Sequence, residues 1–169
     1  FLALERIRIF MRENNVNFWQ AKDITAAANL FTTHTPVPAG LERFGFDLID
    51  EHFTDYYRDL GLNRNQFIDL GRENMGDYEL FSMAVLALNT SSGANGVAKL
   101  HGVVSRKLWQ WMYPEIPEHE IPIGAITNGI HVQTWMSRDM EQLFDRYLDP
   151  AWRDSPSDVN VWRTVDSIP

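Results

Sequence analysis

The sequence predicts a helix-rich α/β protein, and two patterns in its 169 residues support this fold class. First, apolar residues recur every three or four positions in several long stretches, which is the spacing of helices with one buried face. Second, short apolar runs at 30–34, 80–88 and 121–126 end in turns rich in glycine, proline or small polar residues. Helices that alternate with short buried strands are typical of α/β sheets.

The first helix is expected over residues 1–13, where Phe1, Leu4, Ile7 and Met11 share one face. The same spacing over residues 20–29 predicts a second helix. Its apolar positions are Ala21, Ile24, Ala27 and Ala28, and such small side chains predict close packing against a sheet. The chain therefore begins with two helices that lead into the first strand.

That strand is expected over residues 30–34 and ends at His34. Pro36 and Pro38 follow, and each fixes φ and lacks a backbone N–H donor, so a stiff loop must replace the strand and close at Gly40. An imidazole held at a strand end by a rigid loop is well placed to meet a ligand. These residues alone favour a packing histidine and leave the ligand-binding role open.

The middle of the chain predicts a strong amphipathic helix over residues 46–60, which ends at Gly61 in the usual position for glycine. The polar residues 62–77 predict a connection with a short helix. The run 80–88 is apolar throughout, so its periodicity does not separate a buried strand from a buried helix.

Residues 89–96 are small and polar, and they predict a loop that leads into a helix over 97–111. An apolar run, a small-residue loop and a helix start are typical of a βα turn, where ligands lie near helix N-termini. The spacing is not GxGxxG, so it predicts no dinucleotide site. The buried face of the helix is expected to carry Val97, Leu100, Val104, Leu108 and Trp111.

The last strand is expected over 121–126 and ends in the turn Thr127-Asn128-Gly129. Ser137 is expected to cap a final helix over 137–148. The buried face of this helix is expected to hold Met140, Leu143, Phe144, Tyr147 and Leu148.

The domain organisation is expected to be simple. No linker divides the chain, so one domain is expected over residues 1–169. Because the chain opens in helical spacing without Met and closes without a tail, we expect a fragment of a longer protein.

Composition excludes several functional classes. The net charge of −8 argues against a nucleic acid or an anionic membrane as partner, and no apolar run approaches the roughly 20 residues of a membrane helix. The chain has no cysteine, and its five histidines form no i, i+4 pair, so we expect no metal site and a cytoplasmic protein. A GxSxG elbow is missing, and carboxylate pairs such as Asp50-Glu51 are expected to be solvated instead of acting as glycosidase acids.

Three strand ends or turns remain as candidate site elements: His34, Asn95-Gly96 and Thr127-Asn128-Gly129. If their strands are parallel, the carboxyl ends meet at one edge of the sheet. That edge is where α/β sheets bind their ligands.

The same segments resemble the α-glucan (glycogen, starch or maltodextrin) phosphorylases. The similarity rests on Thr33-His34-Thr35, on the stretch from Asn95 to His101, and on Thr127-Asn128-Gly129-Ile130 with Trp135, in this order. The stretches 31–40 and 100–106 are closer to the short bacterial and archaeal members than to the animal enzymes.

The resemblance implies the GT-B fold, in which two Rossmann-like domains enclose the active site. This chain would be the later part of the N-terminal domain and would reach the crossover to a missing C-terminal domain. Family members transfer a glucosyl unit from an α-1,4-glucan to orthophosphate, which gives α-D-glucose 1-phosphate with retention. They use pyridoxal phosphate on a lysine that lies outside this chain, so the isolated chain is expected to be inactive and to hold no cofactor. The whole protein is expected to be a homo-oligomer.

The resemblance also implies roles for single residues. His34 would bind the glucosyl 6-hydroxyl, and its backbone carbonyl would lie beside the reacting ring, which makes it the catalytic candidate. Asn128 would bind the same hydroxyl, and Trp135 would lie beside the cofactor. The sugar pocket would also be lined by Asn95, Gly96 and Val97.

One segment departs from the family pattern, because His131-Val132-Gln133-Thr134 stands where animal enzymes have Thr-Pro-Arg-Arg. The contacts that the animal enzymes make through those four residues are therefore not assigned to this chain. Two other hypotheses remain open at this point: a fragment of a nucleotide-sugar GT-B glycosyltransferase, and a non-catalytic glucan-binding module.

Overall fold

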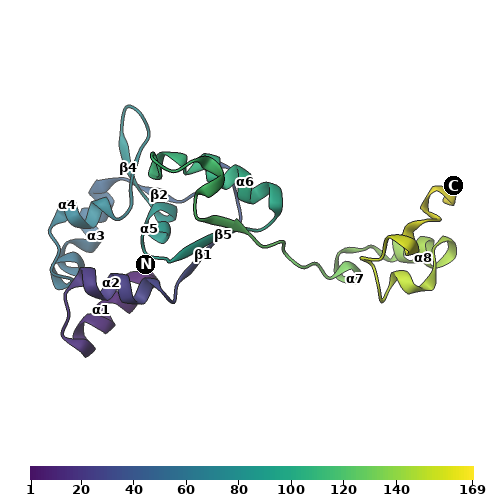
Figure 1. Cartoon of the computed structure of the whole chain (residues 1–169), viewed down its shortest axis with the longest axis horizontal. Helices are drawn as coiled ribbons and strands as arrows, with labels where there is room; N and C mark the ends of the chain where they lie inside the picture. Colours follow the sequence, from purple (N-terminus) through teal and green to yellow (C-terminus); the bar gives the residue numbers. More distant parts are fainter. The chain divides into compact units, whose positions relative to one another are not determined.

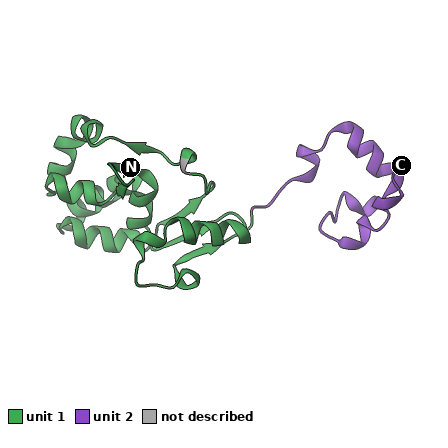
Figure 2. Ribbon diagram, turned by 90° about the horizontal axis from the view of Figure 1, so that it is seen from above, with its two compact units in different colours: residues 1–127 green, residues 128–169 purple. Residues whose placement is uncertain are grey.

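The computed structural model describes residues 1–169 except for the side chain of Pro38. The chain forms two compact units, Phe1–Thr127 and Asn128–Pro169 (Figure 2). Helices and a parallel sheet occur together, so the predicted α/β class is confirmed. The expectation that all 169 residues belong to one domain of a longer protein stays a prediction.

The elements of each unit follow in chain order, and Figure 1 labels the α-helices and several of the strands. Unit 1 contains α1 (Leu2–Asn14), α2 (Phe18–Ala26), β1 (Leu30–Thr33), η1 (Pro38–Gly40), β2 (Arg43–Phe44), α3 (Phe46–Asp59), α4 (Arg64–Asp69), β3 (Arg72–Asn74), β4 (Glu79–Ser82), α5 (Met83–Asn89), β5 (Gly93–Gly96), α6 (Lys99–Leu108), η2 (Gln110–Met112), η3 (Glu118–Glu120) and β6 (Ile123–Ala125). Unit 2 contains α7 (Val132–Trp135), α8 (Arg138–Tyr147), η4 (Pro150–Trp152), η5 (Val159–Trp162) and η6 (Val165–Ser167).

The parallel sheet has the strand order β1-β5-β6, and both neighbouring pairs are parallel. The strands predicted over 30–34 and 121–126 are confirmed as β1 and β6. The central strand is a correction, because β5 lies in the stretch that the sequence predicts as a loop. Its residues have low strand propensity, and they form a strand because β1 and β6 pair with both of its edges.

The apolar run 80–88 does not form one element but is divided between two. Its first residues belong to β4, and α5 begins directly after Ser82, whose hydroxyl accepts a hydrogen bond from the Val85 backbone N–H at 3.4 Å. A serine at this position satisfies a free N–H of the first helical turn. The run is therefore a strand end followed by a helix.

The predicted buried face of the helix over 97–111 is confirmed only in part, since Leu108 packs against the core and Val97 is half-buried. Leu100 is 74% exposed, and Val104 and Trp111 are exposed as well, whereas Gly102, Ser105 and Trp109 are buried. The reason is steric at Gly102, where the backbone of α6 approaches the sheet so closely that a Cβ would lie 2.9 Å from the Gly124 oxygen. Apolar spacing alone does not report this constraint.

The other helices of unit 1 form a separate core, and most of its residues come from α1 to α4. The helices predicted over 1–13 and 46–60 are confirmed, and α3 is followed by Gly61 with a φ of +70°. The second helix packs chiefly against α1, so the prediction that its alanines lie against a sheet is wrong. The short helix predicted within 62–77 is α4. The antiparallel sheet β2-β4-β3 was not predicted.

Unit 2 has its own small core of Leu148, Trp152 and Val161. Ser137 caps α8 as predicted, since its hydroxyl accepts a hydrogen bond from the Met140 N–H at 3.3 Å. Phe144 packs edge-on against Trp152, with the ring centres 5.5 Å apart. The predicted apolar face of α8 is confirmed in part, because Phe144 and Leu148 reach this core while Met140 is exposed.

A nearly buried ion pair joins two strands of the antiparallel sheet. The Arg43 guanidinium donates two hydrogen bonds to the Glu73 carboxylate, at 2.8 and 2.9 Å. Burial by itself raises the pKa of Glu73, but the hydrogen bonds from Arg43 and Ser82 outweigh it, so the pKa lies below its usual value. Charge pairs of this kind are costly to break from one side only.

We therefore expect Glu73→Gln to lower the free energy of unfolding by about 3 kcal/mol. Because the folded pKa of Glu73 lies below an unfolded value of about 4.3, its stabilisation is complete above that pH and is lost as the pH falls through the folded pKa. Urea unfolding followed by circular dichroism between neutral and acid pH measures both effects, and the variant should show a shallower loss in acid. Asp55→Asn, which breaks the exposed pair with Arg58, should leave the unfolding midpoint unchanged. Equal effects of the two variants would contradict the prediction.

Candidate functional site

The candidate site lies at the carboxyl edge of the parallel sheet. The last residues of the three strands are paired in register, with Thr33 opposite Gly96 and Gly96 opposite Ala125. The residues that follow, among them His34 and Val97, therefore leave the sheet at the same edge. The structure brings the first two predicted segments together there, and β6 runs parallel beside them as expected.

The loop after β1 holds itself in place by hydrogen bonds. The Thr33 hydroxyl donates to the Thr35 carbonyl at 3.2 Å, the Thr35 hydroxyl accepts from the Val37 N–H at 3.2 Å, and the Gly40 N–H donates to the Val37 carbonyl at 2.9 Å. A Cβ at Gly40 would lie 2.9 Å from the Thr35 methyl group, so the loop closes tightly at this glycine. These contacts support the prediction of a stiff connection.

His34 emerges from this frame with an exposed side chain. Its imidazole makes no hydrogen bond with any residue that the structure describes, and it is not a core residue. Both ring nitrogens are therefore open to a ligand. A neutral imidazole offers one donor and one acceptor, which suits a hydroxyl group.

The middle segment of the site is more buried. Asn95 is 5% exposed, Gly96 is buried, and Val97 is half-buried. The Val97 backbone N–H donates to Nδ1 of His101 at 3.2 Å, so the neutral His101 ring carries its proton on Nε2. His101 thus caps the end of β5 from the first turn of α6.

A close contact between backbones sets the position of α6. A Cβ at Gly96 would lie 2.9 Å from the Gly102 nitrogen, and a Cβ at Gly102 would lie 2.9 Å from both the Gly124 oxygen and the Ala125 Cβ. Any larger residue at these two positions must push the helix away from the sheet. The pair of glycines therefore fixes the height of α6 above the strand ends.

Asn128 and Trp135 belong to unit 2, whereas the other predicted site residues belong to unit 1. Asn128 is exposed at the start of its unit. Trp135 ends α7 and is 83% exposed. It lines a mostly apolar hollow of about 440 Å³ together with Ile130, Val132, Met136, Ser137, Met140 and Phe144.

The side chains that line this hollow could form a contact surface for a flat ring. An exposed indole among apolar side chains can stack on a pyridine ring. No lysine lines the hollow, and the three lysines of the chain, Lys22, Lys99 and Lys107, all lie in unit 1. The residues present thus fit packing against a cofactor such as pyridoxal phosphate, but not its covalent attachment.

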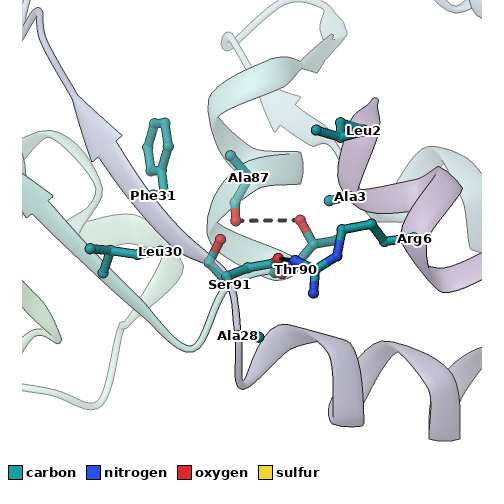
Figure 3. A pocket seen from close by; sticks show the side chains of 10 residues that line it. Leu2, Ala3, Arg6, Ala28, Leu30, Phe31, Ala87, Thr90 and Ser91 are labelled. Atoms are coloured by element: carbon teal, nitrogen blue, oxygen red, sulfur yellow. Dashed lines mark hydrogen bonds between the residues drawn. The ribbon is translucent and has the colours of Figure 1, made fainter. Parts of the chain in front are cut away.

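A second hollow, of about 330 Å³, lies away from the candidate site (Figure 3). It is lined by the start of α1, by Leu30 and Phe31 at the beginning of β1, and by the residues that end α5. It therefore borders the amino end of the first strand, opposite to the end that carries His34. None of the predicted site residues lines it.

Within the residues that the structure describes, no three His, Asp or Glu side chains gather to hold a metal ion. Over the same residues, no helix is long and apolar enough to cross a membrane.

A parallel α/β sheet with uncharged polar groups at its carboxyl edge defines a class of proteins that bind ligands at strand ends. Within that class, the chain belongs to the carbohydrate phosphorylase family, whose model matches residues 2–166. The resemblance seen in the three motifs is thereby confirmed.

Three relatives illustrate the match. The chain is 37% identical over 169 residues to a maltodextrin phosphorylase of Thermococcus litoralis, and 35% identical over 174 residues to a glycogen phosphorylase of Mycobacterium tuberculosis. It is 30% identical over 141 residues to a glycogen phosphorylase of Aquifex aeolicus. These alignments cover 100%, 99% and 83% of this chain but 20% of each relative. The chain thus spans about one fifth of the length of these relatives.

The close approach of α6 to the sheet can be tested by Gly102→Ala. Helix propensity alone would make this change stabilising by about 1 kcal/mol, but the added methyl meets the Gly124 backbone. We therefore expect a loss of about 1–3 kcal/mol in urea unfolding, as for other overpacked sites. Gly124→Ala is the matched control, because its Cβ would find its nearest neighbour at 3.8 Å and should cause no loss. A stabilised Gly102→Ala variant would contradict the close contact.

Proposed function

We propose that this chain is part of an α-1,4-glucan phosphorylase, which transfers the terminal glucosyl unit of a glucan to orthophosphate. The product is α-D-glucose 1-phosphate, formed with retention of configuration. The family match over residues 2–166 carries this proposal. The names of the relatives, maltodextrin phosphorylase and glycogen phosphorylase, support glucan as the substrate class. They favour this function over a nucleotide-sugar glycosyltransferase and over a non-catalytic glucan-binding module.

In this proposal, His34 and Asn128 hold the 6-hydroxyl of the transferred glucosyl unit. An imidazole and a side-chain amide supply donors and acceptors without placing a charge in the pocket. A sugar ring held in one position loses less freedom on the way to the transition state, which lowers the entropic part of the barrier. Asn95, Gly96 and Val97 border the same pocket at the end of β5.

Pyridoxal phosphate would supply, when bound, a phosphate group that passes a proton to and from the substrate phosphate. Trp135 would pack beside it, as its exposed indole in an apolar hollow permits. The attachment lysine and the phosphate-binding residues would come from the rest of the protein. This chain would therefore position the sugar, and other residues would carry out the proton transfers.

We further place this chain in a GT-B fold, as the later part of the N-terminal Rossmann-like domain. All of residues 1–169 would belong to that domain and would reach the crossover to the C-terminal domain, which lies outside this chain. A homo-oligomeric, cytoplasmic protein is part of the same proposal. The parallel strands β1, β5 and β6 would belong to the sheet that faces the cleft.

The role of Asn128 is tested in the longer protein that carries this chain. Asn128→Ala removes one hydrogen bond to the 6-hydroxyl, worth about 1.5 kcal/mol, so kcat/KM for phosphorolysis of a maltooligosaccharide should fall roughly tenfold or more. The absorbance of the bound cofactor should stay unchanged. Asn160→Ala, at an exposed asparagine of the same unit, should leave kcat/KM unaltered. Full turnover by Asn128→Ala would remove Asn128 from the site.

A second experiment uses residues 1–169 alone. With a maltooligosaccharide and orthophosphate they should release no glucose 1-phosphate, because the lysine that attaches the cofactor would come from the rest of the protein and unit 2, which holds Trp135, contains no lysine. For the same reason, pyridoxal phosphate should be lost on dialysis. The longer protein serves as the positive control. Sustained product release by the isolated chain would show that the chemistry resides here.

A further inference from the structure

Thr32 and Asn95 face each other across the first two strands of the parallel sheet. The Thr32 hydroxyl donates a hydrogen bond to Oδ1 of Asn95 at 3.0 Å, and Nδ2 of Asn95 donates to the Gly96 carbonyl at 3.3 Å. Asn95 is 5% exposed, so its bond to Gly96 is buried, and its bond with the half-buried Thr32 is partly sheltered from water. Thr32 lies two residues before His34 in the sequence.

The orientation of the Asn95 amide follows from its partners. The Gly96 carbonyl is an acceptor only, so the amide group that faces it must be the NH₂ donor. The amide oxygen then points to Thr32, whose hydroxyl acts as the donor. With the amide reversed, two oxygens would face each other in a buried place, which is costly.

The same carbonyl also reaches the third strand. The Ile126 backbone N–H donates to the Gly96 oxygen at 2.9 Å, and Ile126 lies two residues before Asn128 in the sequence. A connected set of hydrogen bonds thus runs from Thr32 through Asn95 and Gly96 to Ile126. These bonds connect the segments that directly precede His34 and Asn128, the two residues that are proposed to hold the 6-hydroxyl.

We propose that Thr32 and Asn95 are positioning residues for His34, and that the Asn95 side chain acts on the sugar through this bond instead of touching it. The inference rests on the proposed phosphorylase function and assigns to it two residues that act together. His34 is fixed from one side by the Thr32 bond and from the other by the closed loop from Thr35 to Gly40. Removal of the Thr32 hydroxyl breaks the hydrogen bond before His34 and leaves the closed loop after it intact.

The test compares two substrates in the longer protein, in the direction of glucan synthesis. One is α-D-glucose 1-phosphate and the other is its 6-deoxy analogue, which lacks the hydroxyl that His34 would hold. Thr32→Val keeps the shape of the side chain and removes the hydroxyl. We expect kcat/KM for the natural substrate to fall roughly tenfold, and kcat/KM for the 6-deoxy analogue to change less than about twofold, because nothing is left for His34 to hold.

The ratio of the two values is independent of how much of the variant is correctly folded. Thr32→Ser, which keeps the hydroxyl, should retain the wild-type ratio. Thr90→Val is the control, because it removes the hydroxyl of a buried threonine in the same way, and that hydroxyl bonds the Leu86 carbonyl on α5, away from the carboxyl ends of the strands. Its ratio should also stay at the wild-type value.

The outcomes separate this inference from the proposed function. If the wild type does not join glucose 1-phosphate to a maltooligosaccharide, the proposed function fails. If the wild type is active and prefers the natural substrate, but Thr32→Val loses equally on both substrates, the positioning role fails and the function stands. A Thr32→Val variant with unchanged values on both substrates overturns the inference as well.

Discussion

The close approach of α6 to the parallel sheet is the constraint on which the candidate site depends. Two glycines, Gly96 on β5 and Gly102 on α6, leave no room for a side chain between strand and helix. This contact explains why both positions lack a side chain and is consistent with the exposure of Leu100 and Val104 on α6. It also sets the height at which the helix begins above the strand ends, where Val97 meets His101.

A strand of small residues has a second effect, on the chemistry of the edge. The side chains that flank His34 in the sequence, those of Thr32, Thr33 and Thr35, carry hydroxyls, and Thr32 bonds the buried amide of Asn95 on the next strand. None of these groups is charged. Such groups can order a sugar hydroxyl without the desolvation cost of a buried ion. In the rest of the described chain, the charged pairs lie elsewhere, as in the Arg43–Glu73 pair of the antiparallel sheet. The buried ion pair that stabilises the fold thus lies outside the proposed sugar pocket.

The parts that were predicted correctly from the sequence have a local signal. Regular apolar spacing located α1 and α3, prolines located the end of β1, and a serine cap located α8. The central strand β5 could not be predicted, because its residues have low strand propensity and pair only in the presence of β1 and β6. The apolar spacing of α6 does not predict which face of the helix packs on the sheet, because a backbone contact at Gly102 sets that face. His34 and Asn128 were found through family motifs, whereas Thr32 carries no signal until its partner across the sheet is known.

The construction of β5 also bears on how the chain folds. Thr32 and Asn95 are 63 residues apart in the sequence, and the pairing of β1 with β5 closes that long loop before β6 can add to the other edge. Loop closure over such a distance is slow compared with the formation of helices. Helices α3 and α4 lie within this loop, and α1 and α2 come directly before it in the chain. We expect the core that these four helices share to form first and to hold the ends of the loop near each other. The candidate site would then be the last part of unit 1 to be completed, and its integrity would report that the whole unit is folded.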